Sequence, residues 1–499
     1  MGFFWEGHLR KRMRAGAVVV ALGVLGAVPA AADPAPGAPG VGDPIYPRAG
    51  NGGYDVQHYD IDLRYQPATD ELTGQTTLHA VATQDLSQFN LDFALKVTSV
   101  RVGGEPASFR VDAADKTELI VTPGAPVAQG RPLTVTVDYA DIPSQVQVDG
   151  VQVWHRTETG GVSIGQPRSS ETWFPANDHP SDKATYRVSA TVPAGTTALS
   201  NGVLTGPSQP VPGWSRWDWR ADEPMVSYLP FIALGKYELT EGVAGNKPYY
   251  TAYDESLREV LPTAKEAIER TPEITGFLAS KFGPYPFGSL GGVATTGWNS
   301  AIENQTRPVY GELFEPGKDG TWVVAHELAH QWYGDSVALA DWSTMWLNEG
   351  FATYGEWLWS EHRGSGTAAE LADAFYAKYP AEDAFWQLKL WPGTRLFASA
   401  VYERGAMTLQ ALRTEVGDDV FFRILEGYHS KYRGGHATTP DFVQFAEDLA
   451  GRRLDALFQT WLADPVKPAT GPNGTPVTTV KHLPVMDEMI HAHHAAHPH

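Results

Sequence analysis

The stretch His326-Glu327-Leu328-Ala329-His330 has the pattern H-E-x-x-H. On a helix, residues four apart lie on one face, with Cβ atoms about 5–6 Å apart. Two neutral imidazoles at that spacing can hold one Zn²⁺ ion. Glu327 follows the first histidine directly and is placed to reach a water on the metal rather than the metal itself. The stretch therefore predicts a helix that carries part of a zinc hydrolase site.

A third metal ligand is expected further along the chain, because a catalytic zinc usually has three protein ligands and one open position. Glu349 lies nineteen positions after His330, in the segment Trp346-Leu347-Asn348-Glu349-Gly350-Phe351-Ala352. That distance lets one helix end, a loop turn back and a second helix bring a carboxylate to the metal. We therefore expect His326, His330 and Glu349 to hold one Zn²⁺ ion per chain.

These two motifs resemble the M1 family of zinc aminopeptidases (gluzincins), and the resemblance extends from about Tyr54 to about Trp461. It implies an enzyme that removes N-terminal residues from peptides with a free N-terminus, with Glu327 as the catalytic base. It also implies a multidomain α+β fold, in which an N-terminal all-β domain (a twisted sheet or sandwich) precedes a mainly α, thermolysin-like catalytic domain. Larger family members continue with further C-terminal domains, so this chain is expected to be a short member that lacks them.

The resemblance also assigns residues that bind the amine of the substrate. Family members carry a G-x-M-E-N motif whose glutamate holds the free α-amino group. The segment Ser300-Ala301-Ile302-Glu303-Asn304 is similar to it, with serine in place of glycine and isoleucine in place of methionine. Glu303, Asn304 and Ala301 are therefore expected to bind substrate.

Two further positions of the family pattern lie outside that motif. Val401-Tyr402-Glu403-Arg404-Gly405 resembles the segment whose tyrosine donates to the oxyanion, which makes Tyr402 the expected donor. A second amine-binding glutamate, found in the β domain of family members, corresponds to Gln166. The amine would then be held by one carboxylate instead of two, unless Glu171 substitutes.

The hydrophobic pattern divides the chain in the same order as the motifs. Tyr59, Ile61, Leu63 and Tyr65 alternate with polar residues, which is strand periodicity, and short strand-like runs continue to about residue 237. From about residue 255 the spacing of apolar residues becomes helical. We place a β domain at 54–240 and a mainly α zinc peptidase domain, with room for a small sheet, at 241–464.

The N-terminus has the features of a secretory signal peptide. A basic cluster at 10–14 precedes an apolar run at 15–28, and Ala30-Ala31-Ala32 fits a cleavage site after Ala32. The run is shorter than the roughly 20 apolar residues needed to span a bilayer. We therefore expect a signal peptide at 1–32, an extended lead-in at 33–53, and a secreted mature chain without a membrane span.

A flexible tail rich in Pro, Gly and His is expected at 465–499. Such a tail could capture extra metal, or it could be a disordered end without function, and both interpretations stay open. Its histidines are His482, His491, His493, His494, His497 and His499.

The composition excludes some function classes. The 499-residue chain has a formal net charge of -20, whereas phosphate binding needs clustered Lys and Arg, so nucleic acid is excluded as a partner. The chain has no cysteine, but it is long enough to bury a large core without disulfides.

Two alternative functions remain open at this stage. The first is a zinc endopeptidase, or another hydrolase on the same scaffold, and the departures at Gln166 and Ser300 support it. The second is a non-catalytic protein that binds peptides or metal. The intact zinc ligands, base and tyrosine argue against that second alternative.

Overall fold

The computed structural model describes residues 33–489. The predicted signal peptide at 1–32 lies outside the described residues, and so do five tail histidines, His491, His493, His494, His497 and His499, so these assignments stay predictions. Within residues 33–489, no helix combines the length and the apolar character needed to cross a membrane.

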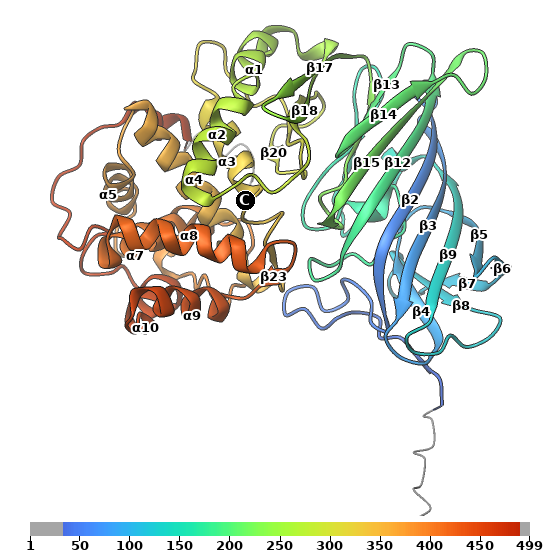
Figure 1. Ribbon diagram of the computed structural model, residues 1–499, viewed down its shortest axis with the longest axis horizontal. Helices are drawn as coiled ribbons and strands as arrows, with labels where there is room; N and C mark the ends of the chain where they lie inside the picture. The colour runs from blue at the N-terminus through green and yellow to red at the C-terminus, as the bar shows by residue number, and fades with distance from the viewer. Residues whose placement is uncertain (1–32, 490–499) are drawn as a thin grey trace, which may run out of the picture. The chain divides into compact units, whose positions relative to one another are not determined.

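The first half of the described chain is built from strands (Figure 1). Its largest sheet has eight strands in the order β14-β15-β12-β2-β3-β9-β5-β6. Their bounds are β2 (Tyr54–Gln66), β3 (Glu71–Ala82), β5 (Val97–Val102), β6 (Glu105–Pro106), β9 (Pro132–Asp141), β12 (Lys183–Pro193), β14 (Val203–Ser208) and β15 (Trp214–Val226).

Two four-stranded sheets complete this half, in the orders β1-β4-β8-β7 and β10-β11-β16-β13. Their bounds are β1 (Ala35–Pro36), β4 (Leu86–Asp92), β7 (Ser108–Val111), β8 (Glu118–Thr122), β10 (Trp154–Arg156), β11 (Gly161–Ser163), β13 (Thr197–Leu199) and β16 (Ile232–Gly235).

Strand β2 has the two faces that its sequence predicts. Tyr59, Ile61, Leu63 and Tyr65 are each at most 2% exposed, whereas the residues between them are half-buried or exposed. Successive side chains of a strand point to opposite faces, so this alternation places one face in the core and the other toward solvent.

The second half is mainly helical and contains a five-stranded sheet in the order β17-β18-β19-β21-β20. The strands of that sheet are β17 (Tyr237–Ala244), β18 (Lys247–Asp254), β19 (Leu290–Ala294), β20 (Ala301–Ile302) and β21 (Val309–Tyr310). A short two-stranded sheet pairs β22 (Ala338–Leu339) with β23 (His436–Ala437).

The helices of this half are α1 (Leu261–Ile268), α2 (Thr271–Phe282), α3 (Thr321–His330), α4 (Trp346–Arg363), α5 (Ala368–Lys378), α6 (Ala384–Gln387), α7 (Gly405–Val416), α8 (Asp418–Tyr432), α9 (Thr439–Ala450) and α10 (Asp455–Phe458). The predicted fold class, an all-β domain followed by a mainly α domain, is confirmed. Strand β17 crosses residue 240, where the sequence placed the domain boundary, because it pairs with β18 in the five-stranded sheet.

Lys183, in the β domain, is hydrogen-bonded to two loops of the helical half, one after helix α3 and one before strand β23. Its ammonium donates to the carbonyl oxygens of Asp335 at 2.7 Å, Ser336 at 3.0 Å and Gly435 at 3.3 Å. Three backbone acceptors replace the water that the buried ammonium loses. The β domain is therefore bonded directly to the segment beside the predicted zinc helix.

Candidate active site

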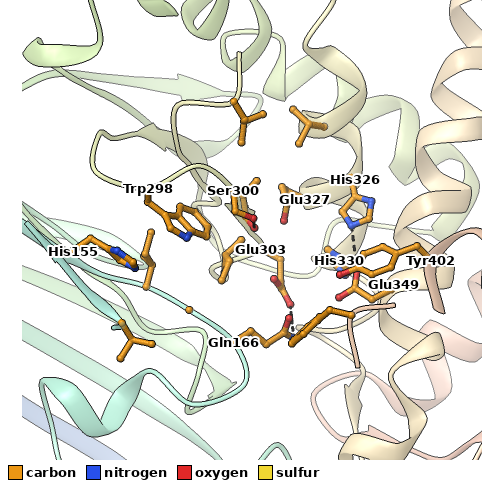
Figure 2. A pocket seen from close by; sticks show the side chains of 18 of the residues that line it. His155, Gln166, Trp298, Ser300, Glu303, His326, Glu327, His330, Glu349 and Tyr402 are labelled. Carbon is orange, nitrogen blue, oxygen red and sulfur yellow. Dashed lines mark hydrogen bonds and ion pairs between the residues drawn. The ribbon is translucent and has the colours of Figure 1, made fainter. Parts of the chain in front are cut away.

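Helices α3 and α4 bring the three predicted metal ligands together. Helix α3 carries His326 and His330 one turn apart, and Glu349 lies in the first turn of α4. The Oε2 atom of Glu349 lies 3.3 Å from Nε2 of His326 and 3.4 Å from Nε2 of His330. Figure 2 shows the three side chains converging on one point, and their ligand atoms all lie within 4.8 Å of one another.

This donor set fits a zinc ion. Zinc binds imidazole nitrogen and carboxylate oxygen at about 2.0–2.2 Å, so neighbouring ligands of a tetrahedron lie about 3.3–3.5 Å apart. The separations of 3.3 and 3.4 Å match that value. His326, His330 and Glu349 all line the cleft, so a fourth position would face the substrate.

A second layer of side chains orients the two imidazoles. Nδ1 of His326 is bonded to Oε1 of Glu356, and Nδ1 of His330 lies 3.1 Å from Oδ1 of Asn348. Partners of this kind fix the tautomer, so that each Nε2 atom keeps its lone pair for a metal. Neither of these two roles was predicted from the sequence. Glu356 could have been found, because it lies seven positions after Glu349 on the same face of α4.

Glu327 lies in the cleft beside these ligands and is 5% exposed. Burial raises its pKa to about 8, against the opposing effect of the imidazoles of His326 and His330. A general base works best when its pKa lies near the working pH. The environment of Glu327 therefore suits a group that takes up and releases a proton.

Tyr402 lines the cleft beside His330 and Glu349, on the side of these residues that faces away from His155 (Figure 2). It belongs to a π-helical turn, Ala400–Arg404, that precedes α7. Its ring stacks near His326 with a centroid separation of 6.1 Å. Burial, together with the carboxylate of Glu349, raises the pKa of Tyr402 well above its usual value. The phenol therefore keeps its hydrogen and can act as a donor.

Glu303 follows the short edge strand β20 and is 2% exposed. Three side chains donate to its Oε1 atom: Tyr228 at 2.7 Å, Gln166 at 3.3 Å and Asn348 at 3.3 Å. Figure 2 shows Gln166 and Glu303 joined in this way beside the metal ligands. Tyr228 was not predicted from the sequence. Its contact brings a loop of the β domain to the motif of the catalytic domain.

Of the other residues predicted for the amine site, some line the cleft and others do not. Ala301 lines the cleft, but Asn304 does not belong to the cleft lining, and its amide donates to the carbonyl of Leu229 at 2.7 Å. Glu171 does not replace the missing second carboxylate, because it is bonded to Arg168 at 2.6 Å outside the cleft. In the described part of the chain, the side chain beside Glu303 at the place of the expected second carboxylate is Gln166.

The cleft has a volume of about 340 Å³ and is largely apolar. Its ionisable lining groups are the carboxylates of Glu303, Glu327 and Glu349, the histidines and the phenol of Tyr402, whereas the described lining contains no lysine or arginine. The apolar part of the lining comes from both domains and consists of Val151, Val153, Ile164, Trp298, Ala301, Ile302, Leu313, Trp322, Val323 and Phe397.

Comparison with known proteins agrees with this geometry. Residues 55–229 match the family model for the peptidase M1 N-terminal domain, and residues 315–461 match that for the peptidase family M1 domain. Aminopeptidase M1-D of Oryza sativa subsp. japonica is 29% identical over 66% of this chain and 39% of its own length. Glutamyl aminopeptidase of Homo sapiens is 26% identical over 63% of this chain and 35% of its own length. The chain thus spans less than half the length of these curated relatives.

One solved structure is similar to this chain over the whole length of that structure. The M1 zinc metallopeptidase of Deinococcus radiodurans is 29% identical, with a TM-score of 0.76, over 88% of this chain and 100% of that structure. A mutant of that enzyme, bound to a Tyr-Ser-Ala substrate, matches with a TM-score of 0.74 at 28% identity over 89% of this chain and 99% of that structure. Two family models, their order along the chain and the buried His-His-Glu group agree: the chain belongs to the M1 family of zinc metallopeptidases.

Proposed function

We propose that this chain is a secreted zinc aminopeptidase that removes one residue at a time from peptides with a free N-terminus. It would hold one Zn²⁺ ion per chain, at His326, His330 and Glu349. The relatives support peptide hydrolysis, and the amine subsite supports cleavage at the N-terminus.

One observation carries the aminopeptidase proposal: the amine-binding carboxylate lies beside the catalytic groups. Glu303, Glu327 and His330 each place a ligand atom within 4.8 Å of the others. Successive residues of an extended peptide are about 3.8 Å apart. The space between Glu303 and the metal ligands therefore suits one residue, whose ammonium reaches Glu303 while its carbonyl reaches the metal site. Cleavage would follow that first residue.

The residues of the cleft divide the reaction between them. Glu303 binds the ammonium and so fixes which peptide bond is attacked. Glu327 takes a proton from the attacking water and delivers it to the leaving nitrogen. Tyr402 donates its hydrogen to the carbonyl oxygen as negative charge develops there. Zinc in its site would supply Lewis acidity toward the carbonyl and lower the pKa of a water.

Strand β20 supports a binding mode for the rest of the peptide. It is the edge strand of the five-stranded sheet, and Ala301 within it lines the cleft. An edge strand offers backbone groups to which an extended peptide can add as a further strand. Ala301 would then bind substrate through its backbone rather than its methyl group.

Aminoacyl nitroanilides test the proposal directly. We expect the purified protein to release nitroaniline, to lose this activity in a chelator and to regain it when zinc is added. Peptides that differ only in N-terminal acetylation separate the two peptidase alternatives. Cleavage of the free peptide alone supports an aminopeptidase, whereas equal cleavage of both would indicate an endopeptidase. Absence of both activities with zinc bound would indicate a binding protein.

Secretion is a separate part of the proposal and rests on the basic, apolar and small-residue segments of residues 1–32. We expect the protein in the culture medium to begin at Asp33, which N-terminal sequencing would establish. A protein that stays in the cell with Met1 intact would refute secretion.

Extra metal on the histidine tail is likewise a proposal. Truncation before His482 is expected to lower the number of zinc ions bound at micromolar zinc. An unchanged stoichiometry in the truncated protein would assign no metal-binding role to the tail.

A further inference from the structure

The amide of Asn348 lies between a metal ligand and the amine-binding carboxylate. Asn348 is buried in the first turn of α4, directly before Glu349. Its Oδ1 atom lies 3.1 Å from Nδ1 of His330, and its Nδ2 atom donates to Oε1 of Glu303 at 3.3 Å. One side chain thus contacts both halves of the proposed site.

The orientation of this amide follows from the chemistry of His330. Nε2 of His330 faces Glu349 at the metal site, so in a zinc-loaded protein Nε2 offers its lone pair and Nδ1 carries the hydrogen. Nδ1 then donates to Oδ1 of Asn348 and to the carbonyl of Tyr333, both at 3.1 Å. Because the oxygen of the amide is held at His330, its NH₂ group is directed to Glu303.

The backbone around the amide leaves room for this arrangement. Gly334 has a φ of 130°, and a Cβ atom placed on it would lie 2.0 Å from Oδ1 of Asn348. The same Cβ atom would lie 3.2 Å from Nδ1 of His330. A side chain at position 334 would therefore displace the amide from the imidazole. Glycine allows the close approach.

We infer that Asn348 is a positioning residue that couples zinc binding to amine recognition, an inference that rests on the function proposed above. With Zn²⁺ held at its Nε2 atom, His330 would carry its hydrogen on Nδ1 and so fix the oxygen of the Asn348 amide. The amide in turn holds the carboxylate of Glu303 where it receives the ammonium. Loss of the donor toward Glu303 weakens substrate binding, and loss of the acceptor toward His330 weakens zinc binding.

Two substitutions separate the two ends of the amide. Asn348→Asp keeps an oxygen toward His330 but replaces the donor toward Glu303 by a second carboxylate oxygen, which repels it. Asn348→Ala loses both contacts. We expect the zinc dissociation constant, measured by chelator competition, to rise about tenfold in Asn348→Ala and to stay within about threefold of wild type in Asn348→Asp.

Substrate binding gives the second readout. The KM for an aminoacyl nitroanilide is expected to rise about tenfold in both variants, because each loses a hydrogen bond to a charged group. The kcat values should change by less than about threefold, because Asn348 does not touch the reacting atoms. A merely structural role would instead lower the melting temperature without this division between KM and kcat.

Asn90→Ala is the matched control. Asn90 is also buried and donates to a carboxylate, Oε2 of Glu118, at 2.9 Å, but it lies in strand β4, away from the cleft. This substitution is expected to destabilise the fold and to leave the zinc affinity and KM unchanged.

The contact of Asn348 with His330 and its contact with Glu303 are tested by different measurements. Equal zinc affinities of Asn348→Asp and Asn348→Ala would remove the link to His330. A KM that is unchanged or lower in Asn348→Asp would remove the link to Glu303. Zinc affinity is measured without turnover. A wild-type protein that binds zinc but releases no nitroaniline therefore refutes the proposed function and still leaves the His330 link to be judged.

Discussion

Tyr228 donates its phenolic hydrogen to Oε1 of Glu303 at 2.7 Å, and this bond joins the β domain to the carboxylate that we propose binds the amine. Tyr228 lies between β15 and β16 and is 3% exposed. A hydrogen bond to a charged group contributes about 1.5–3 kcal/mol. Tyr228→Phe is therefore expected to raise KM for an aminoacyl nitroanilide by about tenfold or more, with kcat within about threefold.

Tyr54→Phe controls for the loss of a buried hydroxyl. Tyr54 donates to the carbonyl of Asn90 at 2.7 Å within the β domain, outside the cleft. The Tyr54→Phe substitution should lower the free energy of unfolding without changing KM. A large fall in kcat in Tyr228→Phe, with KM unchanged, would mean that Tyr228 supports the chemical step rather than amine binding.

Glu327→Gln should abolish turnover while zinc remains bound. The amide is nearly isosteric with the carboxylate but cannot take the proton of the attacking water. A positioned general base contributes about 10²–10⁴-fold, so kcat is expected to fall by about a thousandfold. Zinc content by atomic emission and steady-state kinetics measure the two effects. Activity equal to wild type would remove the assignment of Glu327 as the base.

Tyr402→Phe should lower kcat far more than it raises KM. In the proposed mechanism the hydroxyl group donates to the oxyanion, which exists only as the reaction proceeds, and loss of one such donor costs about 10²–10³-fold in kcat. Steady-state kinetics across a range of substrate concentrations separate the two constants. If the substitution acted mainly on KM, Tyr402 would bind ground state and transition state alike.

The metal ligands were predictable because helix geometry relates sequence spacing to position. His326 and His330 share a helix face, and Glu349 follows at a distance that suits a second helix. The alternation in β2 was predictable for a similar reason, since a strand repeats every two residues.

Tyr228 could not be predicted, because no local pattern marks it. It lies 75 residues before Glu303, in an irregular loop, and reaches the carboxylate only through the packing of two domains. Asn304 shows the opposite case. Its place in a motif suggested a substrate contact, but the structure directs its amide to the carbonyl of Leu229. A motif identifies a segment, whereas the direction of each side chain depends on its neighbours.

The cleft is expected to reject peptides that begin with an acidic residue. The described lining contains three carboxylates, at Glu303, Glu327 and Glu349, and no lysine or arginine to pair with an incoming acid. Burial lowers the pKa of His155, so that imidazole is not a cationic partner either. An acidic first residue would therefore lose its hydration without gaining a counter-charge.

Glutaminyl and glutamyl nitroanilides isolate this effect, because the two side chains have nearly the same size. We expect kcat/KM to be at least about a hundredfold higher for the glutaminyl substrate, and higher still for leucyl and phenylalanyl substrates that match the apolar lining. Similar values for the Gln and Glu substrates would contradict this account of the cleft.

Glu118 gives the β domain a stability that depends on pH. Its carboxylate is 1% exposed, and burial raises its pKa from 4.5 to about 7, although the bond from Asn90 and the charge of Arg48 oppose the rise. Between these two values the unfolded chain has lost the proton that the folded chain keeps. The contribution of Glu118 to the free energy of unfolding is therefore highest below pH 4.5, falls as pH rises to 7, and is constant above that.

Glu118→Gln removes this titration and keeps an oxygen for the bond from Asn90. Relative to wild type, the variant is expected to gain about 2 kcal/mol of unfolding free energy between pH 4.5 and 7.5, a value reduced for solvent screening. Urea unfolding followed by tryptophan fluorescence measures it, and Glu105→Gln, at an exposed position in β6, should show no such gain. Arg48 lies 3.9 Å from the Glu118 carboxylate. A constant difference between wild type and Glu118→Gln across this range would mean that Arg48 keeps the carboxylate ionised in the folded protein.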